Sequence, residues 1–157
     1  MSDKNDMVEE LGKHPFMEGL SPELVEQMTQ FVKGIKTWDS DEVMFRAGGA
    51  ADDCYLIRSG EVALEVYSPG SGSRIIQTVA GGKVLGWSWL FAPYRWAFDA
   101  RVLTPVEAIV LDGEMMRENI SDNHPLGFEI MTRFARIIVG RLQSTRLQLL
   151  DLYASRN

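Results

Sequence analysis

The sequence has little of what disulfide-linked, metal-binding or membrane-spanning proteins need. It holds one cysteine, Cys54, so no disulfide can form within the chain, and this usage is typical of a reducing cytoplasm. Its two histidines, His14 and His124, are far apart and have no further metal ligands beside them. No apolar run approaches the roughly 20 residues that a membrane-spanning helix needs, and the charged segment 1–10 does not resemble a signal peptide. We expect a cytoplasmic protein without a metal site.

Basic charge and catalytic motifs are also scarce. The chain carries 16 Lys and Arg against 22 Asp and Glu, a net charge of −6, whereas a broad contact with nucleic acid needs a basic surface. The sequence has no Ser–His–Asp order with local motif support, no P-loop and no dinucleotide-binding fingerprint. We therefore expect a protein that is not an enzyme.

The central part of the chain, residues 32–111, consists of short apolar–polar alternations typical of β-strands. A helix precedes it, with Ser21 as the cap and Pro22 at the first helical position, and extends to about Phe31. The alternation on either side of Ser59–Gly60–Glu61 predicts a β-hairpin that turns there. Strands at such regular spacing predict a small antiparallel barrel or roll. The strands that we expect are 33–38, 42–46, 54–58, 62–67, 74–79, 97–103 and 107–111.

The last part of the chain predicts one long helix over residues 125–153, about 40 Å at 1.5 Å per residue. Apolar residues recur there at alternating steps of three and four, which is the seam of a coiled coil. This seam consists of Phe128, Met131, Ala135, Ile138, Leu142, Thr145, Leu149 and Leu152. It predicts a parallel homodimer, whose interface includes the seam from Met131 to Leu152. The alternative, a helix that lies on its own barrel, stays open.

Two segments of the chain resemble a known family. From Tyr55 the sequence follows the pattern Y-x-I-x-x-G-x-V-x-V, with Leu64 in the last place, and Gly82 and Gly86 match a G-x-x-x-G-E turn. In both segments the chain resembles the cyclic nucleotide-binding domain family. The resemblance implies an α+β, mainly β fold: an antiparallel β-roll, or jelly-roll barrel, with an N-terminal helix and a long C-terminal helix. It implies one such domain over residues 14–157, after a partly disordered segment 1–13.

The resemblance also implies a ligand site, from which this sequence departs. In the family, the turn cradles a cyclic phosphate, a Glu after the second Gly binds the ribose, and an Arg about nine residues later pairs with the phosphate. Here Trp87 stands at the Glu position, and Trp96 stands nine residues further on. Arg95 comes one residue early, and Arg101 lies on the next strand, where it could face inward or outward. The usual contacts are therefore replaced or displaced.

Six aromatic residues in twelve positions follow Gly86: Trp87, Trp89, Phe91, Tyr94, Trp96 and Phe98. One interpretation is a pocket rebuilt for a different small ligand. The other is a barrel filled by its own rings, since large aromatic residues in a barrel are usually packing. The candidate ligand-binding residues are Gly86, Trp87, Ser88, Trp89, Arg95, Trp96, Ala97, Arg101 and Thr145.

The family resemblance extends to the long helix and to the function. Residues 141–145, R-L-Q-S-T, are similar to the part of the catabolite activator's helix in which a Thr contacts the nucleotide base, which places Thr145 in the candidate site. The sequence predicts a stand-alone regulatory sensor domain, dimeric through its last helix, that passes its signal to an effector protein. The alternative is a constitutive dimeric adaptor. We expect no DNA binding by this chain alone, because it ends where the activator's DNA-reading domain begins.

Overall fold

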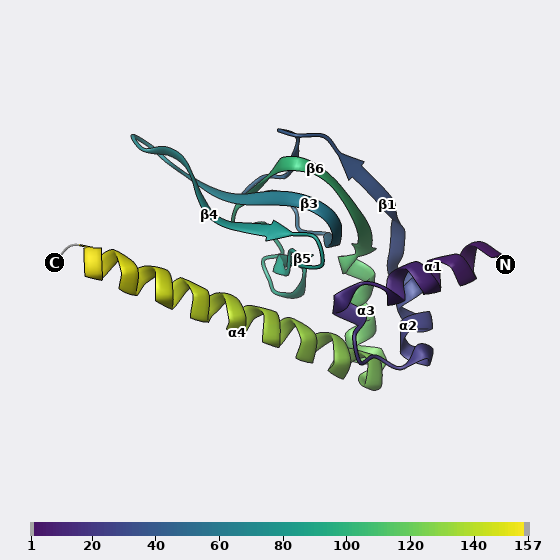
Figure 1. Ribbon diagram of the computed structural model, residues 1–157. Helices are drawn as coiled ribbons and strands as arrows, with labels where there is room; N and C mark the ends of the chain where they lie inside the picture. The colour runs from purple at the N-terminus through teal and green to yellow at the C-terminus, as the bar shows by residue number, and fades with distance from the viewer. Residues whose placement is uncertain (1, 156–157) are drawn as a thin grey trace. The chain divides into compact units, whose positions relative to one another are not determined.

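The computed structural model describes residues 2–155 and divides into two compact units, 1–119 and 120–157 (Figure 1). The first unit contains the N-terminal helices and the whole β-sheet, and the second contains the long last helix. The boundary between the two units falls inside α3, and the single domain that the sequence predicts over 14–157 stays a prediction. Within segment 1–13, for which the sequence predicts partial disorder, residues Ser2–Gly12 form helix α1.

Short helices lead into the sheet. After α1 come the 3-10 helix η1 (Pro15–Met17), helix α2 (Pro22–Met28) and the 3-10 turn η2 (Thr29–Phe31). The cap predicted at Ser21 is confirmed, because its side chain accepts a hydrogen bond from the backbone N–H of Leu24. His14 plays the same role for η1: its ring accepts from the backbone N–H of Phe16, while Nε2 lies 2.9 Å from the carbonyl oxygen of Ile57.

The sheet is antiparallel and has six strands, in the order β1-β6-β3-β4, with β2 beside β6 and β5 beside β3. This arrangement confirms the predicted β-roll class. The strands are β1 (Val32–Trp38), β2 (Val43–Phe45), β3 (Asp53–Ser68), β4 (Gly72–Ala80), β5 (Val84–Leu85) and β6 (Asp99–Asp112).

The hairpin predicted at Ser59–Gly60–Glu61 is wrong. Residues 53–68 form one strand, β3, which pairs with β6 along most of its length and shifts register three times between Ile57 and Val62. Gly60 permits this bend, because its φ is +90° and an added Cβ would lie 2.2 Å from the carbonyl oxygen of Pro105. The strands expected at 97–103 and 107–111 are likewise parts of one strand, β6.

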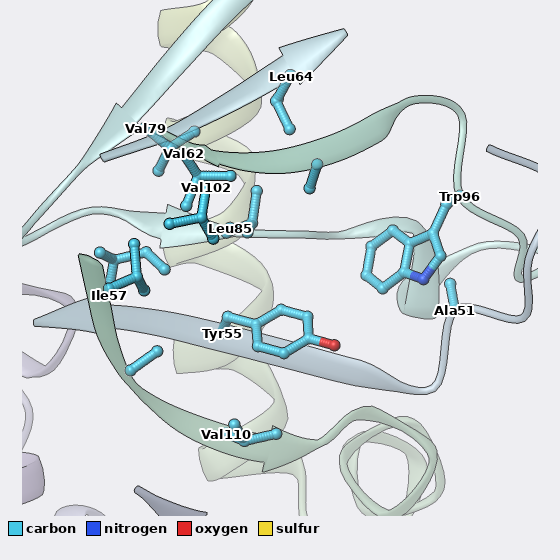
Figure 2. Packing of buried hydrophobic residues seen from close by; sticks show 13 residues of the cluster. Ala51, Tyr55, Ile57, Val62, Leu64, Val79, Leu85, Trp96, Val102 and Val110 are labelled. Atoms are coloured by element: carbon cyan, nitrogen blue, oxygen red, sulfur yellow. The ribbon is translucent and has the colours of Figure 1, made fainter. Parts of the chain in front are cut away.

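The inside of the β-roll is packed with apolar side chains, which Figure 2 shows from close by. On β6 alternate residues contribute to this packing, while Arg101 between the first two of them belongs to the other face. The contributing residues are Ala100, Val102, Val106, Ala108 and Val110. We call this set the interior cluster. It consists of Ala51, Tyr55, Ile57, Val62, Leu64, Val79, Leu85, Trp96, Ala100, Val102, Val106, Ala108 and Val110.

Two helices follow the sheet. Helix α3, Gly113–Asp122, begins directly after β6, and α4 covers His124–Ser155. The helix predicted over 125–153 is therefore confirmed. Within α4, Leu126, Ile130 and Phe134 are buried, whereas most apolar residues of the second half are exposed.

Candidate functional site

The candidate site begins at Gly86, directly after β5. This strand pairs with β3, with Leu85 opposite Tyr55, and the 3-10 turn η3, Ser88–Leu90, follows. Gly86 has a φ of +97°, and an added Cβ would lie 2.7 Å from Cη2 of Trp96. The glycine is therefore needed both for the backbone conformation and for the close approach of the indole ring.

Trp96 is buried inside the β-roll, and the partly buried Phe98 packs against the same cluster. Its backbone N–H donates to the carbonyl oxygen of Gly49, and its carbonyl accepts from Gly48, so segment 94–96 pairs with segment 48–51. The side chain is 6% exposed and belongs to the interior cluster. In Figure 2 the indole points into the same space as the Tyr55 ring. Sequence analysis places Trp96 in the site, and the structure places it inside the roll.

Phe45 completes an aromatic stack inside the roll. Its ring lies parallel to that of Trp96, with the centroids 3.8 Å apart and an interplanar angle of 12°. The Tyr55 ring lies 6.1 Å from Phe45 on the same side of the sheet, and Trp38 meets Tyr55 edge-on. Burial raises the pKa of the Tyr55 hydroxyl, with the charge of Asp53 as a smaller cause. The interior of the roll around these rings is therefore apolar and disfavours a buried anion.

The two candidate arginines have partners elsewhere. Nη1 of Arg95 donates to the carbonyl oxygen of Gly48, 2.8 Å away, and the residue is exposed. Arg101 lies between Ala100 and Val102 of the interior cluster and so faces away from it. Its Nε donates to Oε1 of the buried Glu65 at 2.6 Å, and its Nη1 to Asp41 at 3.2 Å. Neither guanidinium therefore compensates a charge inside the roll.

Trp89 is fully buried, but outside the interior cluster. Its indole Nε1 donates to the carbonyl oxygen of Gly86, and a Cβ on Gly113 would lie 2.7 Å from its own Cβ. Cys54, also fully buried, lies beside this ring, and desolvation raises the pKa of its thiol. Both side chains act as packing, and burial disfavours the reactive thiolate form of Cys54.

The remaining candidates are scattered. Trp87 and Ser88 are partly exposed at the start of η3, and Ala97 is exposed. Thr145 lies on α4, in the second unit, where its hydroxyl donates to the carbonyl oxygen of Arg141. The structure thus brings together Gly86 and Trp96 and adds Phe45 and Tyr55, which sequence reasoning did not assign to the site. The Tyr55 signature was visible, but the contact with Phe45 joins positions 51 residues apart.

Among the described residues, no helix combines the length and the low polarity that crossing a bilayer requires.

Comparison with known proteins agrees with this fold. The family model of the cyclic nucleotide-binding domain matches residues 35–123. The chain is 24% identical over 146 residues to a CRP-like cAMP-activated global transcriptional regulator of Mycobacterium tuberculosis; the match covers 93% of this chain and 63% of the regulator. The chain thus spans less than two thirds of the length of this relative.

Two solved structures show the same architecture. A cyclic nucleotide-binding domain from Methylobacillus flagellatus KT has a TM-score of 0.77 at 18% identity, and the match covers 95% of this chain and 83% of that one. The catabolite activator protein of Thermus thermophilus has a TM-score of 0.68 at 22% identity, and the match covers 89% of this chain and 63% of that one. These likenesses support the fold.

Proposed function

The chain belongs to the cyclic nucleotide-binding domain family, and from this premise we propose that it is a regulatory domain in which Trp96 replaces the cyclic nucleotide. The observation that carries the proposal is the Trp96 indole, stacked on Phe45 and pressed against Gly86. Gly86 belongs to the turn that cradles the phosphate in the family. A side chain in that place and a bound nucleotide exclude each other.

Charge supports the same conclusion. A cyclic phosphate inside the roll needs a paired cation, and a ribose hydroxyl needs an acceptor. Arg95 and Arg101 are bonded to Gly48 and to Glu65, and Trp87 offers only an indole N–H. Loss of both contacts weakens nucleotide affinity by several kcal/mol, each 1.4 kcal/mol being about a factor of ten.

Titration calorimetry with cAMP and with cGMP tests this proposal. We expect no binding of either nucleotide with micromolar or tighter affinity. Micromolar affinity of the unaltered chain for either nucleotide, kept in the outward-facing Arg101→Met, would contradict it.

A second candidate is a sensor of a different small molecule. The partial exposure of Trp87 and Phe98, and the 51% exposure of Phe91, leave aromatic surface at the rim of the roll on which a flat ligand could stack. Tryptophan emission distinguishes the candidates, since three of the four tryptophans are in segment 87–96. A shift of emission on adding aromatic acids supports the sensor, and no shift supports a constitutive adaptor.

We further propose that α4 forms a parallel homodimer. Several seam residues are exposed in the single chain: Phe128, Met131, Leu142, Leu149 and Leu152. Leu142→Asp is expected to convert a dimer to a monomer in sedimentation equilibrium, while Gln143→Asp beside it leaves the mass unchanged. A monomeric unaltered chain rejects this part of the proposal.

The proposed readout is a protein partner in the cytoplasm, reached without DNA recognition by residues 1–157. The regulatory character of the family and the acidic net charge of −6 support this assignment.

A further inference from the structure

Arg117, on the second turn of α3, contacts two residues of segment 86–96, Trp89 in η3 and Tyr94 after it. Its Nη1 donates to the carbonyl oxygen of Trp89 at 2.6 Å. Its guanidinium carbon lies 3.8 Å from the centroid of the Tyr94 ring, a cation–π contact. One side chain of α3 thus fixes residues 89 and 94. We call segment 86–96 the aromatic loop.

Tyr94 has an unusual backbone. Its φ is +57°, in the left-handed region that residues with a side chain rarely adopt. Such a conformation persists where the surroundings fix it, and it is concentrated at functional sites. Here its N–H donates to Phe91, its carbonyl accepts from the N–H of Ala51, and its ring lies under Arg117.

The start of α3 also presses on the aromatic loop. Gly113 leaves no room for a Cβ beside Trp89, and its N–H donates to the carbonyl oxygen of Asp52. Trp89 in turn bonds to Gly86, at the other end of the loop. The loop is therefore joined to α3 by packing at Gly113 and by polar contacts at Arg117.

We propose that Arg117 is a latch: it couples α3 to the aromatic loop and keeps Trp96 inside the β-roll. The inference rests on the proposed function, since it concerns the regulation of the same site. Tyr94 and Trp96 share one backbone segment, and both bond to residues 49–51. When Tyr94 is released from Arg117 and leaves the left-handed conformation, the segment that carries Trp96 loses its support. A partner that displaces α3 then opens the roll, and opening of the roll by the same linkage displaces α3.

The latch is tested in the full chain by hydrogen exchange of backbone amides. Arg117→Met keeps the length of the side chain and removes its charge and its donors. We expect the amides of Ala51, Tyr94 and Trp96 to exchange roughly tenfold faster, the combined effect of one cation–π contact and one charge-assisted hydrogen bond. The amides of Val62 and Val102, in the centre of the sheet, should keep their rates. Arg74→Met, at an exposed arginine of β4, is the matched control.

A second pair of variants covers the possibility that Arg117→Met does not fold. Tyr94→Leu removes the ring and should accelerate the same amides, while Tyr94→Phe keeps the ring and should leave them unchanged. Unchanged rates in both Arg117→Met and Tyr94→Leu overturn the latch, and so does equal acceleration by Tyr94→Leu and Tyr94→Phe.

The latch and the proposed function fail in different experiments. Tight binding of cAMP to the unaltered chain rejects the replacement of the nucleotide by Trp96, whatever the exchange rates are. Unchanged exchange in the variants rejects the latch and leaves that replacement intact.

Discussion

The two faces of the same strands of the β-roll differ in chemistry. Inside, Trp96 stacks on Phe45 above Tyr55, and no charge of Arg95 or Arg101 reaches them. Outside, Arg101 pairs with Glu65 and Asp41. In a fold whose family binds an anion inside the roll, the arginines lie outside and aromatic rings lie inside. The difference indicates that the inner face is stabilised by aromatic packing, whereas the outer face is stabilised by ion pairs.

The largest expected effect comes from removing the ring that fills the interior. Trp96→Ala should lower the free energy of unfolding by about 3–5 kcal/mol, since the transfer energy is lost and a cavity remains. Urea denaturation measures it, with Trp87→Ala, at a partly exposed ring, as the control. A loss below that of the control would show that Trp96 is not part of the core.

The contact between Gly86 and Trp96 gives a second test of whether the Trp96 ring fills the interior. Gly86→Ala should cost about 1–3 kcal/mol, because φ is +97° and the new Cβ meets the indole. The smaller ring of Trp96→Phe should remove part of this cost, so a double-mutant cycle should give a positive coupling between the two positions. Simple additivity of the two changes would place the indole away from Gly86.

Substitutions on the outer face should lower the free energy of unfolding less than those in the interior. Arg101→Met leaves Glu65 buried without its partner, and we expect a loss of about 1–2 kcal/mol, reduced by the partial exposure of the arginine. Arg46→Met, at an arginine 4.0 Å from Asp99 and largely exposed, should change stability little. If Arg101→Met costs more than Trp96→Ala, the outer face and not the interior dominates the stability of the roll.

The smallest expected effect is a pH dependence at His14, which joins the N-terminal helices to β3. Burial lowers the pKa of His14, and the charge of Arg58 adds to this effect. The unfolded chain therefore takes up the proton first as the pH falls. The stability that neutral His14 contributes is complete above its unfolded pKa of about 6.5 and is lost as the pH falls below that value towards the lower folded pKa.

Denaturation midpoints at several pH values measure this dependence. His14→Asn should flatten the stability curve between pH 7 and the acid range, and His124→Gln, at an exposed histidine, should keep it. A curve of His14→Asn that parallels that of the unaltered chain would assign the dependence to other groups.

Much of the fold could be predicted from local patterns. The alternation of apolar residues identified the inward positions of β3, and the cap at Ser21 marked the start of a helix. The turn at Gly60 could not be predicted, because a glycine with positive φ serves a hairpin and a bulge equally well. The partner strand decides whether a hairpin or a bulge forms, and its Pro105, which contacts Gly60, lies 45 residues further along the chain.

Local patterns in the sequence predicted the candidate site only in part. The resemblance placed Trp87 and Trp96 at the positions of the family's polar contacts, but the sequence did not show whether Arg95 faces the pocket. Pairing of segment 94–96 with segment 48–51 decides this, and no local pattern encodes such a contact. Arg117 was missed for the same reason, since its partners precede it by more than 20 residues.

A crystal structure determined in the presence of saturating cAMP tests the central claim most directly. The account predicts that the Trp96 ring stays on Phe45 and that no nucleotide occupies the interior of the roll. A nucleotide in the interior, with Arg95 turned from Gly48 to its phosphate, would contradict the account.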